Sequence, residues 1–169
     1  MSVTFFGNPV TLDGTLPKVQ QSAPNFRLCD NVLDDLELTH FKGKKLLLNI
    51  FPSVDTPVCA NSVRGFNLMA SELDNTVVLC VSNDLPFTLT RFVDEFKLEN
   101  VEIASCFKAP EFAVDYGVSI IGGALTGLTS RAVVVINEEG VVEHVQLVNE
   151  ISEEPDYQSA KAALLGECA

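Results

Sequence analysis

Apolar and polar residues alternate in short blocks along the chain, and these blocks have the lengths of strands and helices in an α/β protein. Residues 45–51 and 76–82 are nearly continuous apolar runs, the pattern of strands buried on both faces of a sheet. Shorter strands are predicted at 26–29, 36–38 and 101–105. Helices are predicted at 57–73, 86–96, 110–116 and 155–165.

The N-terminus is predicted to form a β-hairpin. Residues 3–6 and 10–12 are apolar in character and flank Gly7-Asn8-Pro9, a strong turn signal. Asp13-Gly14 is a second turn signal, so we expect residues 1–14 to be an extension of the main fold.

A second hairpin is predicted near the C-terminus, where residues 132–136 and 141–148 are joined by Asn137-Glu138-Glu139-Gly140. Beyond the N-terminal extension the order of elements is β-α-β-α-β-α-β-β-α. This order predicts an α/β protein with a mixed central sheet flanked by helices, as in a thioredoxin-like fold. We expect residues 1–169 to form one domain.

The stretch 120–129, IIGGALTGLT, is predicted to be a glycine-bearing loop. It is neither a GxGxxG sequence nor a Walker sequence, because no lysine follows its glycines. No nucleotide or other organic cofactor is therefore assigned to this chain.

Composition and charge limit the kinds of partner and the cellular location that we expect for this chain. No apolar run approaches the ~18–20 residues that cross a bilayer, and the N-terminus has no basic segment followed by an apolar core. We therefore expect a cytoplasmic protein. The formal net charge of −12 argues against nucleic acid and anionic membrane surfaces as partners.

Cysteine usage points to thiol chemistry or burial in place of a disulfide framework. The chain has five cysteines and no CxxC pair, and its two histidines, His40 and His144, are isolated from one another. A zinc site needs closely spaced ligand pairs, so no metal is assigned. The cysteines are at positions 29, 59, 80, 106 and 168.

The most informative stretch is FPSVDTPVCANSVRGFN, residues 51–67. Thr56 is predicted to be a helix N-cap and Pro57 the first helical residue, which places Cys59 in the first turn beside free backbone N–H groups. An ordinary cysteine is less than about a tenth thiolate at neutral pH. A helix N-terminus offers an anion only about 0.3–1 kcal/mol, up to ~2 when partly buried. The sequence therefore predicts a reactive sulfur only if a cation also meets it.

The spacing Pro52-x-x-x-Thr56-x-x-Cys59 matches the peroxiredoxin active-site motif, and the longer run resembles the thiol peroxidase subfamily of those proteins. Without this context, burial as a small apolar side chain would be the commoner role of such a cysteine. The resemblance extends over nearly the whole chain. Further matching segments are 3–10, 75–87, 131–136 and 153–157.

The resemblance implies a thioredoxin-like fold, a homodimer and an antioxidant enzyme that reduces hydrogen peroxide and organic hydroperoxides with an external thiol, for which thioredoxin is one candidate. Cys59 would be the peroxidatic cysteine and would pass through a sulfenic acid. Thr56 would hydrogen-bond the peroxide or thiolate, Pro52 would shield the site from water, and Arg131 would supply positive charge. For Thr56 and Arg131 the plain alternatives are an N-cap and a solvated charge. Arg64 is expected on the solvent face of its helix.

The chain departs from the pattern that it resembles at the position of a second cysteine. Thiol peroxidases usually carry a resolving cysteine thirty-four residues after the peroxidatic one, where this chain has Val93. An external thiol that attacks the sulfenic acid directly is the leading hypothesis, and Cys106, just past a strand end, is second. Cys80 and Cys29 are expected to be structural, and Cys168 to be a spectator on the C-terminal tail.

Other functions of a cysteine at a helix start fit less well. A dithiol reductase would normally have a cysteine where this chain has Ser62, and a cysteine phosphatase would need five residues between Cys59 and its arginine where Arg64 leaves four. A cysteine hydrolase needs a histidine base that the sequence does not place near Cys59. A peroxide-sensing protein with little turnover stays open as the alternative function.

Overall fold

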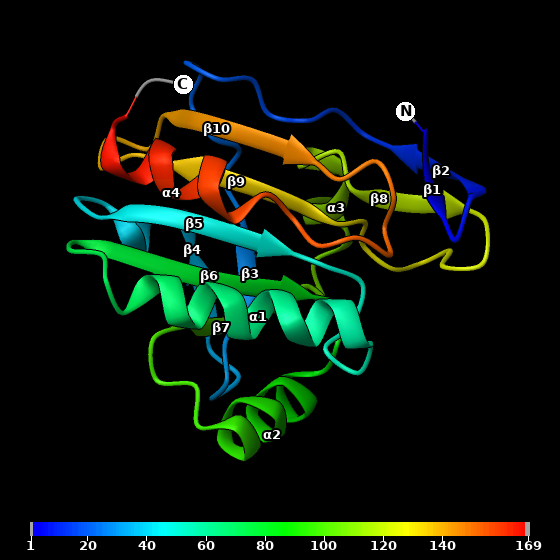
Figure 1. The fold of residues 1–169 in the computed structure, drawn as a ribbon, viewed down its shortest axis with the longest axis horizontal. Helices are drawn as coiled ribbons and strands as arrows, with labels where there is room; N and C mark the ends of the chain where they lie inside the picture. The colour runs from blue at the N-terminus through cyan, green and yellow to red at the C-terminus, as the bar shows by residue number, and fades with distance from the viewer. Residues whose placement is uncertain (1, 168–169) are drawn as a thin grey trace.

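The computed structural model describes residues 2–167, and its centre is a seven-stranded mixed sheet with the order β10-β9-β5-β6-β7-β3-β4 (Figure 1). The parallel core is β5–β6–β7, and β9 runs antiparallel to β5. The α/β, thioredoxin-like prediction is therefore confirmed. The strands are β3 (Arg27–Cys29), β4 (Asp35–Glu37), β5 (Lys45–Ile50), β6 (Thr76–Ser82), β7 (Glu102–Ser105), β9 (Ala132–Ile136) and β10 (Val142–Leu147).

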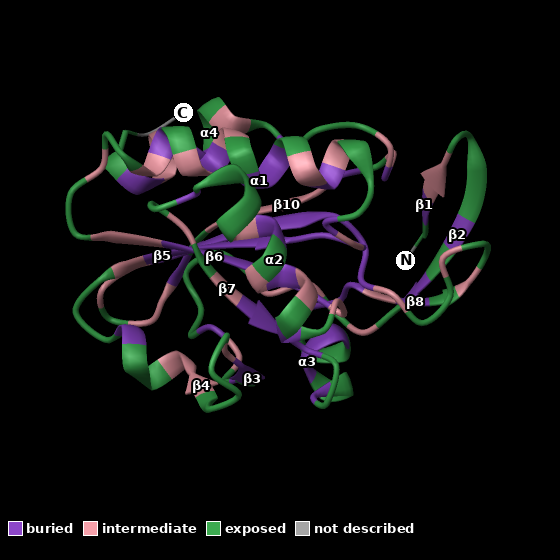
Figure 2. Cartoon of the chain, turned by 90° about the horizontal axis from the view of Figure 1, so that it is seen from below, coloured by how far each residue is buried: buried purple, intermediate pink, exposed green. Residues whose placement is uncertain are grey.

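Helices cover both faces of this sheet, because the central strands are apolar on both sides. On one face, Leu47 and Val133 pack with side chains of α1 (Pro57–Ala70), α2 (Pro86–Phe96) and α4 (Tyr157–Leu165). On the other, Leu48 and Val134 pack against α3 (Pro110–Asp115) and the short 3-10 helix η1 (Leu38–Phe41). Figure 2 shows buried strands between these two layers.

The two faces are alternate side chains of the same strands. In β6, Val78 and Cys80 face α1, whereas Leu79 and Val81 face the opposite cluster. Side chains that differ by one position in a strand are therefore separated by the thickness of the sheet. This alternation decides which cysteines can meet.

The predicted N-terminal hairpin is confirmed as β1 (Ser2–Phe5) and β2 (Asn8–Asp13). The prediction that 120–129 is entirely loop was wrong, because β8 (Ser119–Gly122) pairs with β2 and completes a second, three-stranded sheet. Ile120 is buried there and lies opposite Leu12. The strand is only four residues long and its partner is more than a hundred residues away, so no local pattern reveals it.

Several predicted boundaries also differ from the structure, most by one residue. Helix α1 ends at Ala70, and Leu73 packs against the core from outside the helix. Helix α4 begins at Tyr157, because the Asp156 carboxylate accepts the Ser159 N–H and caps the helix there. Leu38 opens η1 and does not extend β4. The bounds of β6, α2 and β9 match the predictions.

The carboxyl ends of β5 and β6 lie at the end of the main sheet where α1 begins and where the small sheet is attached (Figure 1). In open α/β sheets this edge is where functional residues gather. Among residues 2–167, no helix has the length and apolar character of a membrane span.

Candidate active site

The start of α1 presents Cys59 as the sequence predicted. Thr56 has extended backbone angles and Pro57 is the first helical residue. The first intrahelical bond is 3.0 Å long and runs from Ala60 N to Thr56 O. The N–H groups of Val58 and Cys59 therefore precede the helical ladder and remain available at the helix N-terminus.

Thr56 occupies the N-cap position, but its hydroxyl does not cap the helix. Its Oγ1 donates to the Ser53 carbonyl at 3.0 Å and its N–H bonds the same carbonyl at 3.2 Å. The hydroxyl is therefore fixed in direction by the preceding loop, and its oxygen lone pairs are free to accept a further hydrogen bond.

Arg131 brings a guanidinium to the sulfur. It directly precedes β9, and its Nη2 lies 3.2 Å from Cys59 Sγ, while its Nε donates to the Ile151 carbonyl at 3.0 Å. Both side chains are buried, with an exposed fraction of 1% for each residue. The cation that the sequence required is thus supplied by a residue 72 positions further along the chain.

The charge on Arg131 has no acidic partner. Within residues 2–167, no carboxylate lies within ion-pair distance of its guanidinium, and Nη1 has no hydrogen-bond acceptor. A buried charge is costly unless it is paired. The Cys59 sulfur is the group that this guanidinium faces, and a thiolate there would supply the opposite charge.

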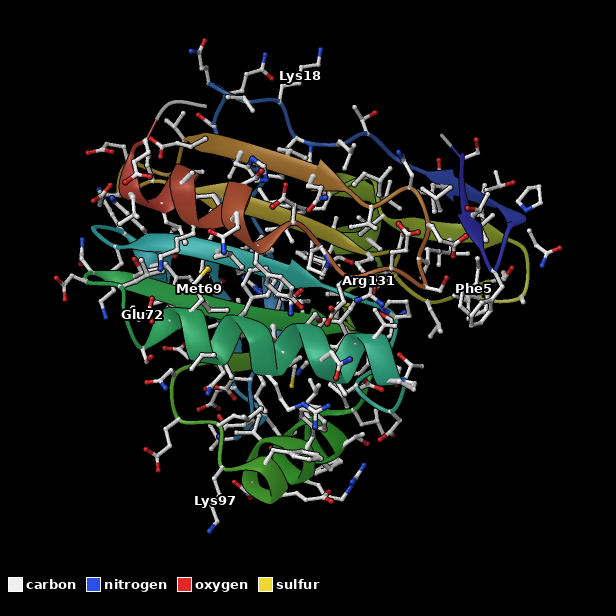
Figure 3. All side chains as sticks on the ribbon, viewed as in Figure 1. Phe5, Lys18, Met69, Glu72, Lys97 and Arg131 are labelled. Carbon is white, nitrogen blue, oxygen red and sulfur yellow. The ribbon has the colours of Figure 1, made fainter. Side chains whose placement is uncertain are left out.

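A cavity of about 190 Å³ leads to the sulfur. Figure 3 places Arg131 and Phe5 at this same end of the molecule. The lining is mostly apolar and comes from the N-terminal hairpin, the loop before α1, the first turn of α1 and segments next to β8 and β9. It consists of Phe5, Phe6, Pro52, Thr56, Pro57, Val58, Cys59, Leu125, Leu128, Arg131, Ile151 and Ser152.

The four residues that the sequence nominated, Pro52, Thr56, Cys59 and Arg131, all line this one cavity. Pro52 is itself buried at the wall. Because the Cys59 residue is only 1% exposed, a small molecule reaches the sulfur through the cavity and not from open solvent.

Asp84 is a residue of the site that the sequence reasoning missed. Its carboxylate accepts hydrogen bonds from Ser53 Oγ at 2.7 Å, the Val54 N–H at 2.8 Å and Ser82 Oγ at 2.7 Å. It thereby fastens the loop before α1 to the end of β6. Its position just after a buried strand was the available signal, because such positions meet at the functional edge of a sheet.

Cys106 lies away from the cavity. It belongs to the apolar cluster on the α3 face of the sheet, whereas Cys59 belongs to the cluster on the α1 face. Its Sγ donates to Asn83 Oδ1 at 2.6 Å. Burial raises the pKa of the Cys106 thiol to about 12, so it is a weak nucleophile as placed.

The remaining cysteines are structural or lie outside the described residues. Cys29 and Cys80 are fully buried, as predicted. Burial raises the pKa of Cys80 to about 12, although a hydrogen bond from the Asn49 amide partly opposes the rise. Cys168 lies outside residues 2–167, so its expected spectator role has no structural description.

Arg64 and Val93 do not line the cavity that contains Cys59. Arg64 is exposed, donates to Asn61 at 2.7 Å and stacks over the Phe96 ring, as a solvent-face residue would. Val93 is half-buried on α2 and packs against the apolar cluster of the α1 face. Within residues 2–167, no three His, Cys, Asp or Glu side chains are grouped as metal ligands.

Comparison with known proteins finds one matching protein family and relatives that share one name. The model of the Redoxin family matches residues 18–164. Over 157 residues the chain is 50% identical to the thiol peroxidase of Vibrio cholerae, which covers 93% of this chain and 96% of that protein. Over 160 residues it is 49% identical to the thiol peroxidase of Corynebacterium glutamicum, covering 95% and 96%.

The fold agrees with solved structures over almost its full length. A peroxiredoxin-like protein from Aquifex aeolicus superposes with a TM-score of 0.92 at 38% identity, covering 99% of this chain and 97% of that one. The agreement includes the N-terminal region that the Redoxin model leaves unmatched.

Proposed function

This chain belongs to the Redoxin family, and from that premise we propose that it is a thiol peroxidase whose reactive group is the Cys59 sulfur. The observation that supports the site is the 3.2 Å contact between Arg131 Nη2 and Cys59 Sγ. The guanidinium is buried and has no carboxylate partner among residues 2–167. The substrates are hydrogen peroxide and organic hydroperoxides.

In the proposed reaction the Cys59 thiolate attacks one oxygen of the hydroperoxide. A sulfur–oxygen bond forms as the O–O bond breaks, so the sulfur is oxidised to a sulfenic acid. The other oxygen leaves as hydroxide or alkoxide and takes a proton from water to become water or an alcohol. Arg131 stabilises the thiolate through Nη2 before the attack.

Charge that develops on the departing oxygen needs donors already in position. We assign that role to the unpaired Nη1–H of Arg131 and to the N–H groups of Val58 and Cys59 at the helix start. The Thr56 hydroxyl, directed by Ser53, accepts the proton of the hydroperoxide in a hydrogen bond. Pro52 and the other apolar walls limit the access of water.

An external thiol completes the cycle in our proposal, and thioredoxin is the first candidate. The burial of Cys106 on the opposite face and its raised pKa support an external reductant over an internal disulfide. Peptide mapping after peroxide treatment under non-reducing conditions tests this ranking. A stoichiometric Cys59–Cys106 disulfide would reverse it.

Steady-state peroxide consumption tests the function itself. The reduced protein should turn over hydrogen peroxide and cumene hydroperoxide with dithiothreitol, and with thioredoxin, thioredoxin reductase and NADPH if thioredoxin is the reductant. The Cys59→Ser variant should be inactive in both assays. If Cys59 consumes one equivalent of peroxide and no added thiol restores it, the protein is a peroxide sensor, the second candidate function.

We further propose that the protein is cytoplasmic, that each chain forms one domain, and that two chains form a homodimer. Exposed apolar side chains at the start of α2 and just after β7, namely Leu85, Phe87 and Phe107, support self-association through this part of the surface. Size-exclusion chromatography with light scattering measures the mass directly. A monomer at micromolar concentration would rule out the dimer without affecting the assignment of the site.

A further inference from the structure

Two phenylalanines of the N-terminal hairpin form part of the cavity that contains Cys59. Phe5 and Phe6 both line it, and their ring centroids are 4.5 Å apart. The hairpin is otherwise packed on β8 and on Ile151, in a small core separate from that of the main sheet. A structural role alone would bury both rings, yet Phe6 is 73% exposed.

The backbone at Phe6 is strained. Its φ is +48° and that of Gly7 is +75°, a pair of left-handed residues in a tight turn. Asparagine, aspartate and glycine are the usual residues at the first of these positions, and a bulky side chain there is costly. Strain that persists beside a reactive group is a reason to look for function.

Glu150 holds this turn in place. Its carboxylate accepts the Phe6 N–H at 2.9 Å, the Gly7 N–H at 3.0 Å and the Thr4 hydroxyl at 2.7 Å. Both the N–H and the hydroxyl of Ser152 donate to the same carboxylate. Five hydrogen bonds thus converge on one side chain at the edge of the cavity.

Residues 150–152 also hold the Arg131 guanidinium in place. The Ile151 carbonyl accepts Arg131 Nε, and its N–H donates to the Thr4 carbonyl at 2.8 Å. Backbone hydrogen bonds therefore join strand β1 to residues 150–152. The Glu150 side chain adds the hydrogen bonds that fix the Phe6–Gly7 turn.

We propose that Glu150 is a positioning residue that holds the Phe6 ring over the cavity, beside Phe5, and thereby sets the preference for hydroperoxides with apolar substituents over hydrogen peroxide. An aromatic or alkyl substituent contacts the rings, whereas hydrogen peroxide has nothing to place against them. This inference rests on the proposed peroxidase function.

The test compares kcat/KM for cumene hydroperoxide with kcat/KM for hydrogen peroxide. Glu150→Gln replaces one acceptor oxygen with an NH2 donor that faces the N–H groups of the turn. The ratio of the two constants should fall about tenfold in Glu150→Gln and in Phe6→Ala, the effect expected from losing one aromatic contact. The double variant should fall no further than Phe6→Ala alone, because Glu150 acts through Phe6.

Glu153→Gln is the matched control, since Glu153 is exposed on the same segment and its side chain makes no hydrogen bond within residues 2–167. Its ratio should stay within about twofold of wild type. An unchanged ratio in Glu150→Gln, equal loss on both peroxides, or additive effects in the double variant would overturn the inference alone. A wild-type protein inactive on both peroxides would overturn the proposed function as well.

Discussion

Arg131 shows how one residue can combine positioning and charge. Its Nε is held by the Ile151 carbonyl, Nη2 faces Cys59 Sγ, and Nη1 remains free to donate. A lysine could supply the charge but not three separate directions of hydrogen bonding from one planar group. The guanidinium shape is therefore as important to the site as the charge.

Replacing Arg131 should lower the rate at which the Cys59 sulfur reduces peroxide. We expect Arg131→Lys to reduce kcat/KM by about 10²–10³-fold, the usual effect of removing one preorganised donor. Alkylation of Cys59 by iodoacetamide near neutral pH should slow in parallel, because the thiolate is the species that reacts. Arg64→Lys, on the exposed face of α1, is the control, and an equal loss there would contradict the assignment.

Glu150 should make the stability of the hairpin depend on pH in the acid range. Hydrogen bonds from Ser152, and then from Gly7 and Thr4, lower the pKa of Glu150 from 4.5 to about 2. Because the folded pKa is the lower one, this stabilisation is complete above pH 4.5 and is lost as the pH falls toward 2. The difference in the free energy of unfolding between wild type and Glu150→Gln should narrow over this range. Urea unfolding at several pH values measures it, and a constant difference would refute the coupling.

Among the elements, the loop before α1 depends on contacts with a neighbouring strand end. Asp84 accepts the Ser53 hydroxyl and the Val54 N–H, and Ser53 in turn fixes Thr56. The first turn of α1 is therefore oriented by β6 as well as by its own sequence.

Asp84→Ala should loosen this loop and lower kcat/KM about tenfold for both peroxides, because misplacing Thr56 affects every substrate. The ratio between the two peroxides should stay near the wild-type value, in contrast to the Glu150 variants. Asp94→Ala, at an exposed position of α2, should have little effect. Steady-state kinetics decide the matter, and a changed ratio would show that Asp84 acts on specificity.

A glycine follows α3 for two reasons, its backbone conformation and the lack of space for a Cβ. Comparison with a second glycine separates these two causes. Gly117 has φ +68°, and a Cβ there would lie 2.4 Å from Leu16 N. Gly140 has φ +82°, with nothing within 4 Å of a Cβ. Gly140→Ala should cost about 1 kcal/mol from the backbone alone, and Gly117→Ala about 1–3 kcal/mol more from the clash. Urea unfolding of both variants measures the difference, and equal costs would contradict it.

In the molecule as a whole, the sheet keeps the thiols apart. Cys59 opens to the cavity on the α1 face, Cys80 is buried beneath that face, and Cys106 is buried on the other. A cysteine in a parallel strand core has no access to peroxide unless the sheet opens. Reactivity is therefore selected by position in the fold and not by the number of cysteines.

One equivalent of hydrogen peroxide should accordingly oxidise Cys59 before any other thiol in residues 2–167. Trapping with dimedone and mass spectrometry should find the adduct on the peptide that contains Cys59. Burial and the raised pKa of Cys80 and Cys106 should leave both unlabelled. Comparable labelling of Cys106 would show that the core opens during the reaction.

The sequence by itself determined the elements whose signals are local. The apolar run of β6, the amphipathic pattern of α2 and the Thr56–Pro57 start of α1 all depend on neighbours within a few residues. For the same reason it placed Cys59 in the first helical turn. The 119–122 strand was missed because its pairing with the N-terminal hairpin leaves no local trace.

Only the tertiary structure decided which residues meet. The order of strands brings Arg131 to Cys59 across 72 positions, Glu150 to Gly7 across 143, and Asp84 to Ser53 across 31. Such contacts follow from how strands are arranged in a sheet, and the short-range periodicity of a chain carries no information about that arrangement. The sequence could nominate the Cys59 sulfur, whereas the residues that orient and enclose it follow from the packing of distant segments.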